Sequence, residues 1–402
     1  MKSGLAETKQ LSEQQRLIVE SVEELCSKFD DRYWRELDSK GSYPEEFLKS
    51  IERLGLAALP VPEEYGGPSL GLREAYLVLE NINLNGGNSQ PLHGQYYLLF
   101  NLTKFASPTL KEKYLTRLAR GEMRLQSFAL TEPDAGSDTT RISTSAKKKG
   151  GEYEINGHKI FISRVMQSDL MLIAARTTPY EEVNKKTEGI SLFLVDLRDA
   201  ISKGQIEAKQ IRTIFNSQTY ELYIRSLMIP EENMVGEEGR GFRYLLDVLN
   251  PERILISAEC IGDAKWFVNK CVNYANSRVV FQRPIGVNQG VQFPIASVYS
   301  ELVAAEALSW QAAGYYDEYS RKGRIDEKLM GAYANISKYL AAECSSKAAN
   351  VAMDIFGGYS MTRDTDVARK MIENRLYRVA PISQNLVLGY LAHSVLGLPK
   401  SY

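Results

Sequence analysis

The sequence predicts an α+β protein of three domains, with helices in the first, a small β-sheet in the second and helices again in the third. The chain has 402 residues, more than one hydrophobic core usually serves. Apolar residues recur at helical spacing near both ends, whereas short strand-like runs separated by turns occupy the middle. We therefore expect domains over residues 1–125, 126–232 and 233–402.

The first predicted domain is helical. Ser12-Glu13-Gln14-Gln15 reads as a capping box, and an apolar stripe at helical spacing follows it. Tyr96 and Tyr97 could contact a cofactor, but aromatic residues in a helical region are more often part of the core. A second helix is expected to open at 42–47, with further helices near 70–84 and 108–119.

The second predicted domain is built from strands. Strand-like runs at 171–175, 190–195 and 220–224 are set between turn signals, which is typical of a small β domain. The run Lys147-Lys148-Lys149-Gly150-Gly151 could be read as a phosphate site, but charged runs usually face water. We therefore interpret this run as a solvated hairpin tip.

One stretch of this domain, residues 126–163, has the features of a binding site. An apolar run at Phe128 ends in the loop 131–138, which is rich in hydroxyls and backbone N–H groups and suits a flat cofactor beside a phosphate. Asn156-Gly157 indicates a turn, and the alternating strand after it should place Phe161 and Ser163 on one face. These features alone predict only a strand, a loop and a hairpin that could hold a planar group.

The third predicted domain returns to helices. Gly239-Arg240-Gly241-Phe242 should lead into a helix that ends near Ser277, with a kink expected at Pro251 because proline cannot donate to the carbonyl four residues earlier. The stretches 291–320 and 326–356 are long and rich in alanine, as in a packed bundle. Gly357-Gly358 should cap the second of them.

Composition excludes several classes of function. Lys and Arg total 49 against 50 for Asp and Glu, so no basic excess points to nucleic acid or an anionic membrane surface. Four widely spaced cysteines and three histidines make a zinc site unexpected, and reduced core thiols are the default interpretation. No apolar run approaches a membrane span, and the N-terminus lacks a signal-peptide pattern, so we expect a cytoplasmic protein.

Two strings in the middle domain point to a known family. Residues 131–138 read TEPDAGSD, and residues 156–163 read NGHKIFIS. Together they resemble the flavin-binding middle domain of the acyl-CoA dehydrogenase family, and the order α, β, α extends the resemblance over nearly the whole chain. The resemblance implies FAD as cofactor, a C-terminal four-helix bundle, an acyl-CoA substrate oxidised in fatty-acid β-oxidation, an electron-transfer flavoprotein as acceptor, and a homotetramer arranged as a dimer of dimers.

The resemblance also implies which residues contact the cofactor. Phe161 stands where the family usually has a Trp that stacks on the flavin, and Ser163 where it has a Thr that hydrogen-bonds near N5. Arg164 and Val165 depart from the usual Asn-Gly. The implied contacts in the middle domain are Phe128, Leu130, Thr131, Ser137, Phe161, Ile162 and Ser163.

Further cofactor contacts are implied in the third domain. The string from Arg278 to Gly286 resembles RxxFGxxI, and Asp354-Ile355-Phe356-Gly357-Gly358 resembles QxxGG with Asp in place of Gln. In the family, these segments reach the FAD of a neighbouring subunit. The contacts implied here are Arg278, Phe281, Gln289, Asp354, Gly357 and Gly358, with Ser383 and Gln384 on the C-terminal segment.

The family's reaction needs a carboxylate that removes the pro-R α proton of the thioester while hydride leaves the β carbon for flavin N5. Many members carry this base in a C-terminal string like YEGTSEI, but here Ala380 stands in its place. Relatives resembling isovaleryl-CoA and long-chain acyl-CoA dehydrogenases carry it on the first long helix of the last domain, before an arginine. Glu252, which precedes Arg253, matches that position, and Glu259 is the runner-up.

Substrate contacts follow from the same resemblance. Asn250, Arg253 and Ser137 are expected to contact the acyl-CoA, and the backbone N–H of Ala380 to donate to its thioester carbonyl. Two other functions share the fold: a flavin oxidase or monooxygenase acting on a non-CoA substrate, and a non-catalytic FAD scaffold. The pairing of Glu252 with Arg253 argues against the scaffold.

Overall fold

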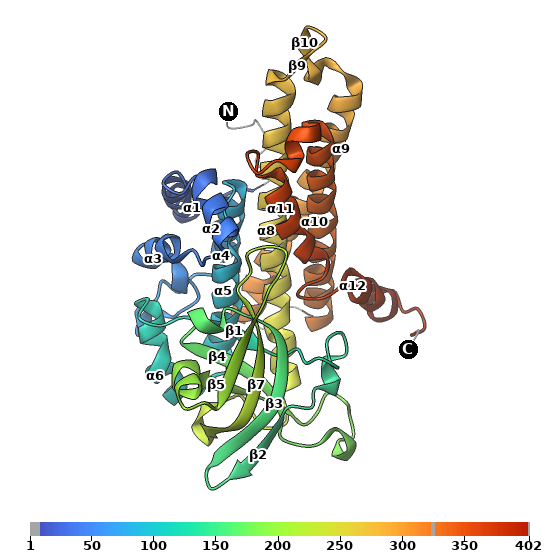
Figure 1. The fold of residues 1–402 in the computed structure, drawn as a ribbon. Helices are drawn as coiled ribbons and strands as arrows, with labels where there is room; N and C mark the ends of the chain where they lie inside the picture. The colour runs from blue at the N-terminus through green and yellow to red at the C-terminus, as the bar shows by residue number, and fades with distance from the viewer. Residues whose placement is uncertain (1–8, 323–325, 401–402) are drawn as a thin grey trace. The chain divides into compact units, whose positions relative to one another are not determined.

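The computed structural model describes residues 9–322 and 326–400, and it has an N-terminal helical region, a middle β-sheet and a C-terminal helical region (Figure 1). By internal packing the chain divides into two compact units. The bundle unit comprises the described residues up to Lys40, Gly71–Ser89 and those from Asn250 onward. The sheet unit comprises Gly41–Leu70 and Gln90–Leu249. The predicted fold class is confirmed, while the three domain boundaries stay predictions.

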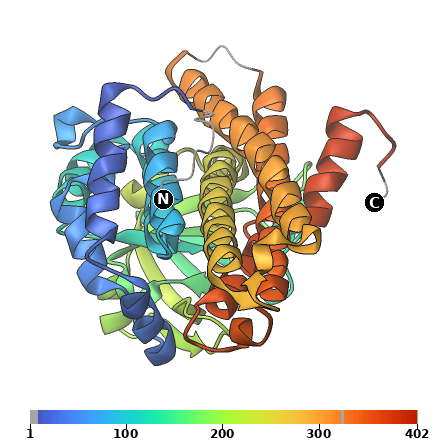
Figure 2. The same cartoon turned by 90° about the horizontal axis from the view of Figure 1, so that it is seen from above.

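The bundle unit is built on three long helices, which Figure 2 shows from one end. Their apolar faces meet in a core that includes Cys260, Leu302 and Phe267. All four cysteines are free and buried, as the sequence analysis predicted. The helices of this unit are α1 Glu13–Cys26, α2 Asp31–Lys40, α4 Leu72–Leu84, α8 Gly241–Ser277 from Asn250 on, α9 Gln289–Lys322, α10 Glu327–Phe356, α11 Val367–Arg375 and α12 Gln384–Tyr390, and the hairpin β9 Val279–Val280 and β10 Arg283–Pro284 joins α8 to α9.

The sheet unit contains a mostly antiparallel sheet in the order β6-β7-β3-β2-β4-β5-β8, with β1 paired in parallel to β4. Its core is lined by Ile173, Phe193 and Leu222 among other fully buried residues. The strands are β1 Leu125–Ala129, β2 Ser145–Lys149, β3 Glu152–Ser163, β4 Leu170–Arg176, β5 Ile190–Asp196, β6 Ile206–Ile211, β7 Thr219–Pro230 and β8 Met234–Val235, and the helices are α3 Glu45–Arg53, α5 Gln90–Phe105, α6 Pro108–Ala119 and α7 Leu197–Ser202.

Most of the predicted elements are present. Ser12 and Gln15 form the reciprocal capping box at the start of α1. Helix α8 continues through Pro251, and Gly357 follows α10 with a φ of 55°. Tyr96 and Tyr97 are buried as core aromatics. No helix among the described residues is both long and apolar enough to cross a membrane.

Two helices of the N-terminal region were not predicted. The helix that opens after residue 44 is the third, because α2 Asp31–Lys40 precedes it with a largely charged sequence that buries only Trp34. Helix α5 Gln90–Phe105 contains Pro91 and Gly94, and it is buried over most of its length. Such a helix has no polar face, so it lacks the periodic pattern from which an amphipathic helix is predicted.

The predicted turn at Asn156-Gly157 is wrong, because β3 runs through it without interruption. The turn lies at Gly150-Gly151, where both φ angles are positive and the preceding lysines are exposed, as expected of a solvated hairpin tip. Gly157 instead allows β3 to pass close to Thr144, because a β-carbon at this position would lie 2.2 Å from the hydroxyl of Thr144. Asn156 accepts a hydrogen bond from the Ser226 N–H at a bulge in the β3–β7 pairing.

Candidate active site

The loop 131–138 is fastened to β3 by a buried lysine. The ammonium group of Lys159 is fully buried and donates to the Leu130 carbonyl and to Oε1 of Glu132, each at 2.9 Å. The N–H of Ile160 donates to the Thr131 carbonyl at 3.0 Å. The backbone at Leu130 and Thr131, two of the predicted cofactor contacts, is therefore fixed by its neighbours on β3.

Glu132 is the second anchor of this loop. Its Oε2 accepts from the N–H and the hydroxyl of Ser143 at 2.6 and 2.8 Å, and its Oε1 accepts from the Thr144 N–H at 3.0 Å. Burial alone would raise the pKa of Glu132, but the Lys159 charge and the hydrogen bonds from Thr144 and Ser143 outweigh it and lower that pKa to about 2. Glu132 is therefore a carboxylate in the folded protein.

The other predicted cofactor residues of the sheet unit differ in accessibility. Phe161 has a φ of 59° and its ring is 62% exposed, so it stands out from the end of β3. This positive φ, with a register shift between Lys159 and Ile162, breaks the expected alternation. Ser137 is exposed, and Phe128, Leu130, Thr131 and Ser163 are half-buried. The side chain of Ile162 lies in the sheet core, which leaves only its backbone for a cofactor.

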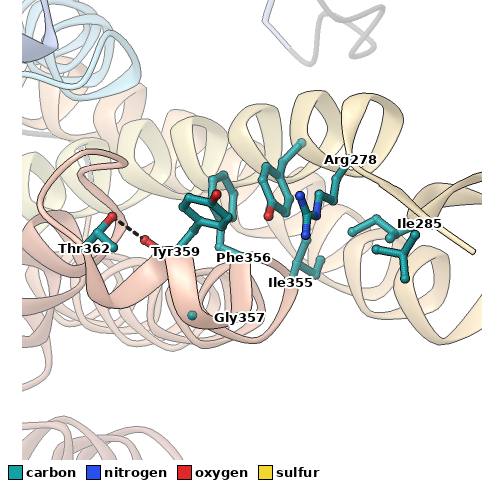
Figure 3. A pocket seen from close by; sticks show the side chains of 10 residues that line it. Arg278, Ile285, Ile355, Phe356, Gly357, Tyr359 and Thr362 are labelled. Carbon is teal, nitrogen blue, oxygen red and sulfur yellow. Dashed lines mark hydrogen bonds between the residues drawn. The ribbon is translucent and has the colours of Figure 1, made fainter.

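A cavity of about 470 Å³ lies within the bundle unit, where α8, α10 and the segment after α10 meet (Figure 3). The rings of Tyr274 and Phe356 stack in its wall at 4.2 Å, and the Arg278 guanidinium lies 5.9 Å from the Tyr359 ring centre. Gly357 and Gly358 also line it. The structure thus brings together Arg278, Gly357 and Gly358 from two predicted segments.

The remaining predicted residues of those segments do not line this cavity. Phe281 is 94% exposed at the tip of the β9–β10 hairpin, with a φ of 50°. Gln289 and Asp354 are also exposed, at the start of α9 and near the end of α10. These three side chains are placed for contacts outside the cavity.

The predicted base, Glu252, lies on α8 directly after Pro251 and is half-buried. Its neighbour Arg253 is buried, and one of its terminal nitrogens donates to the Asn250 side chain at 3.4 Å. Among the described residues, the Nε of Arg253 has no hydrogen-bond partner. Burial lowers the pKa of Arg253, and the charge of Glu252 opposes this. The half-buried side chain of Glu252 therefore sits beside a buried cation.

The runner-up, Glu259, has a different environment. It is fully buried two turns along α8, and its Oε1 accepts from the Ser89 hydroxyl at 3.0 Å. The backbone N–H of Ser89 donates to the Asn83 side-chain oxygen at 3.3 Å, and the Asn83 side-chain nitrogen donates to Asp263 and to the Tyr377 hydroxyl. Glu259 therefore belongs to a buried polar network of the bundle unit.

The C-terminal segment uses its polar groups internally. The N–H of Ala380 donates to the Leu376 carbonyl at 2.9 Å, so a thioester oxygen would have to share this donor. The Ser383 hydroxyl caps α12 by accepting from the Leu386 N–H at 3.4 Å. The side chain of Gln384 is buried and bonded to α10 on both its oxygen and its nitrogen.

Comparison with known proteins identifies the family. The acyl-CoA dehydrogenase N-terminal, middle and C-terminal domains match residues 12–122, 127–225 and 239–381. The acyl-CoA dehydrogenase fadE12 of Mycobacterium bovis is 31% identical over 398 residues, with 97% of this chain and 98% of that protein covered. The chain belongs to the acyl-CoA dehydrogenase family. It is therefore an oxidoreductase and a flavoprotein, as predicted.

Solved structures of the family support this assignment. The glutaryl-coenzyme A dehydrogenase complex with glutaryl-CoA aligns with a TM-score of 0.88 at 29% identity, covering 98% of both chains. The FAD complex of PigA aligns with a TM-score of 0.87 at 25% identity, covering 97% of this chain and 99% of that one. The prediction of FAD as the cofactor is confirmed by the family assignment.

The residues of this chain fit FAD. Stacked aromatic walls and one arginine suit a flat ring joined to a phosphate, which is the chemistry of the adenosine diphosphate half of FAD. Apart from the adjoining residues of the chain, no atom lies within 4 Å of a β-carbon built at Gly357 or Gly358, so the wall of the cavity is open there. In the sheet unit, the exposed ring of Phe161 offers an apolar face to a flavin.

Sequence reasoning did not single out the buried anchors of the site. Lys159 was predicted only as a member of the string NGHKIFIS, and no role was predicted for Lys338 of α10, which is also fully buried. A signal existed in each case. Lys159 is an even number of residues from Tyr153 and Ile155, which face the core, and Lys338 is at helical spacing from the buried Ala334 and Ala341.

The low pKa of Glu132 predicts acid sensitivity. Because the folded pKa is about 2 and the unfolded value about 4.5, the folded carboxylate contributes about 3 kcal/mol, fully present above about pH 5 and lost as pH falls. About 1.4 kcal/mol of this should be gone by about pH 3.5. Urea unfolding of the wild type and Glu132→Gln at about pH 6 and 3.5 measures this. The variant should lose less stability between the two; equal losses would contradict the assignment.

Proposed function

We propose that this chain oxidises an acyl-CoA thioester to the trans-2-enoyl-CoA, with Glu252 as the base that removes the α proton. The observation that carries the proposal is the pair on α8, a half-buried carboxylate next to the buried guanidinium of Arg253. A base must be reachable by substrate, and the half-buried side chain of Glu252 supports this role, with the charge of Arg253 close by.

The chain's own residues divide the remaining work. When bound, FAD supplies the hydride acceptor for the β carbon of the thioester. Glu252 takes the α proton, so the substrate loses one proton and one hydride in total. Arg253 and Asn250, which are joined by a hydrogen bond, hold the acyl-CoA beside the base. The backbone of Ala380 contributes a donor to the thioester oxygen, in competition with the carbonyl of Leu376.

The choice of Glu252 over Glu259 rests on burial. Glu259 is fully buried and already accepts a hydrogen bond from Ser89, so a substrate would have to displace the network around it. Glu252 is partly exposed, and α8 presents it one residue before Arg253. Proton removal by Glu252 therefore needs no rearrangement of the core of the bundle unit.

The proposal includes the assembly and the electron acceptor. We expect a dimer to be part of the site because Arg278, Gly357 and Gly358 line a cavity of the bundle unit, and the matching segments in the family reach the FAD of a neighbouring subunit. The homotetramer, as a dimer of dimers, is expected from the family resemblance alone. The acceptor proposed for the reduced enzyme is an electron-transfer flavoprotein. An oxidase reaction would instead pass the electrons to oxygen.

An anaerobic titration of the purified, FAD-containing protein tests this function. Acyl-CoAs of varied length and branching are added while the visible absorption of the flavin is followed. We expect bleaching by at least one acyl-CoA, with the steepest titration marking the preferred acyl group. Slow reoxidation by oxygen but fast reoxidation by a one-electron dye would support the dehydrogenase. A yellow protein that no thioester bleaches would reject the proposal.

A further inference from the structure

Lys338 is a buried cation with no role in the chemistry described above. It lies in the middle of α10, fully buried, and its ammonium donates to the Ile382 carbonyl at 2.7 Å and to Oε1 of Gln384 at 3.0 Å. Both acceptors are neutral oxygens of the segment that carries Ala380. Charge-assisted hydrogen bonds of this kind are stronger than neutral ones, so this contact fixes the segment firmly.

A second contact holds the same segment from α10. The Gln384 side-chain nitrogen donates to the Tyr339 carbonyl at 3.2 Å and to Oε1 of Glu343 at 3.0 Å. Glu343 also pairs with Arg378 at 2.7 Å. The segment 378–384 is therefore tied to α10 at its beginning by Glu343 and at its end by Lys338 and Gln384. We call these four side chains, Lys338, Glu343, Arg378 and Gln384, the α10 clamp.

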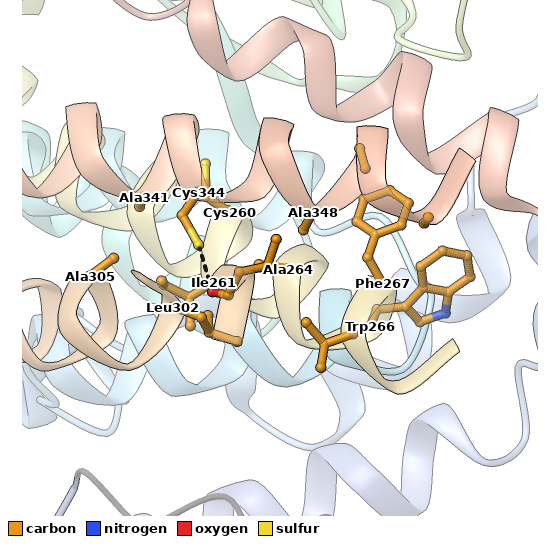
Figure 4. Packing of buried hydrophobic residues seen from close by; sticks show 14 of the residues in the cluster. Cys260, Ile261, Ala264, Trp266, Phe267, Leu302, Ala305, Ala341, Cys344 and Ala348 are labelled. Atoms are coloured by element: carbon orange, nitrogen blue, oxygen red, sulfur yellow. Dashed lines mark hydrogen bonds between the residues drawn. The ribbon is translucent and has the colours of Figure 1, made fainter. Parts of the chain in front are cut away.

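The helix that carries the clamp is itself firmly placed. Ala341 and Cys344 of α10 pack beside Cys260 of α8 in the core of the bundle unit (Figure 4). Helix α8 is also the element that carries Glu252. Side-chain contacts across a close-packed core leave little freedom for one helix to shift against the other. The clamp therefore fixes the segment that holds Ala380 with respect to the helix that holds the proposed base.

Burial of the Lys338 charge is energetically unfavourable. Burial lowers its pKa to about 8; Cys260 opposes this, while the charge of Arg253 adds to it. An apolar side chain of similar length would avoid the cost of burying a charge. A cation kept there at such a cost is better explained by what it holds in place than by stability of the helix bundle.

We infer that Lys338 is a positioning residue of the active site: through the α10 clamp it fixes the segment 378–384, and with it the Ala380 backbone, against the thioester of the acyl-CoA. This inference rests on the proposed function. Lys338 does not touch the reacting atoms. It acts by holding a backbone donor at one place, and displacement of such a group by about 1 Å costs on the order of 100-fold in rate.

The test compares Lys338→Met with Lys370→Met in the FAD-loaded protein. Lys370 is a stringent control because it is also fully buried in the bundle unit and donates to a backbone carbonyl, that of Gly87, at 2.9 Å. It also pairs with the buried Asp263 at 2.6 Å, so its loss should destabilise the bundle unit at least as much as loss of Lys338. Both variants should lose thermal stability. In anaerobic rapid mixing with the preferred acyl-CoA, Lys338→Met should lower the limiting rate of flavin reduction by about 10- to 100-fold, whereas Lys370→Met should change it by less than about threefold.

Glu343→Ala provides a second route to the same answer. Glu343 is about one-third exposed, so this variant should fold even if Lys338→Met does not. Because it loosens both Arg378 and Gln384, it should slow flavin reduction about three- to tenfold at saturating substrate. In Lys338→Met and Glu343→Ala, the factor by which the limiting rate of flavin reduction falls should exceed the factor by which the half-saturating acyl-CoA concentration rises. General destabilisation does not produce this pattern.

The outcomes separate this role from the proposed function. A wild type that no acyl-CoA bleaches overturns the proposed function and the positioning role together. A wild type that bleaches while Glu343→Ala and any foldable Lys338→Met reduce at the normal rate overturns the positioning role alone. Equal slowing in Lys338→Met and Lys370→Met would likewise overturn it, because the effect would then be one of stability.

Discussion

Replacement of Glu252 by glutamine is expected to lower turnover roughly 1,000-fold or more while FAD stays bound. Glutamine keeps the size of the side chain and removes the group that accepts the α proton. The residue is half-buried on the surface of α8, so the change leaves no cavity in the core. Anaerobic mixing with the preferred acyl-CoA should show binding, seen as a perturbed flavin spectrum, without bleaching on the timescale of the wild type.

Glu259→Gln is the matched control for this experiment. It makes the same chemical change two turns along the same helix, in a side chain that accepts a hydrogen bond from Ser89. Its amide oxygen can still accept that bond, so we expect a modest loss of stability and near-normal turnover. If Glu252→Gln turned over normally and Glu259→Gln did not, the base would be Glu259 and the present assignment would be wrong.

The helical regions could be predicted where a buried stripe alternated with a polar face. Helix α1 has a capping box and an apolar stripe, and both signals agreed with its structure. Helix α5 had no such contrast because it is buried over most of its length, and α2 was missed because its sequence is largely charged. Local pattern detects a boundary between core and solvent, so it fails for a helix such as α5 that lies almost wholly in the core.

The error at Asn156-Gly157 has a related cause. An Asn-Gly pair suits a tight turn, which needs the conformational freedom of glycine. It also suits a β-bulge where a neighbouring residue packs closely, which needs the small size of glycine. Only the neighbour across the sheet distinguishes them, and here that neighbour is Thr144. The sequence shows that a glycine is required but does not show what it approaches.

The candidate site was predicted in its exposed parts and missed in its anchors. Phe161 and Arg278 were found by resemblance, and the structure places one at an exposed strand end and the other in a cavity wall. Lys159 and Lys338 were not predicted as buried residues of the site because lysine is among the residues least often buried. Their burial follows from tertiary contacts with backbone carbonyls, which no local pattern records.

Lys159→Met is expected to abolish stable FAD binding by releasing the loop 131–138. The variant removes the donor to the Leu130 carbonyl and leaves Glu132 as a buried charge without its cation. Removing one partner of a buried pair costs about 3–5 kcal/mol, a large part of the stability of an ordinary domain. The remaining hydrogen bonds from Ser143 and Thr144 offset only part of the cost of burying the Glu132 charge. Flavin content after gel filtration and the thermal midpoint measure the effect.

Two further variants decide whether the loss comes from the pair or from the altered strand. Lys147→Met makes the same substitution at an exposed position on β2 of the same sheet and should leave FAD binding unchanged. Adding Glu132→Gln to Lys159→Met removes the uncompensated charge, so the double variant should recover stability relative to Lys159→Met. It should not recover FAD binding, because the Leu130 carbonyl still lacks its donor. If the double variant recovered both stability and FAD binding, Lys159 would serve only to neutralise Glu132. If Lys159→Met lost stability but bound FAD normally, Lys159 would not position the loop.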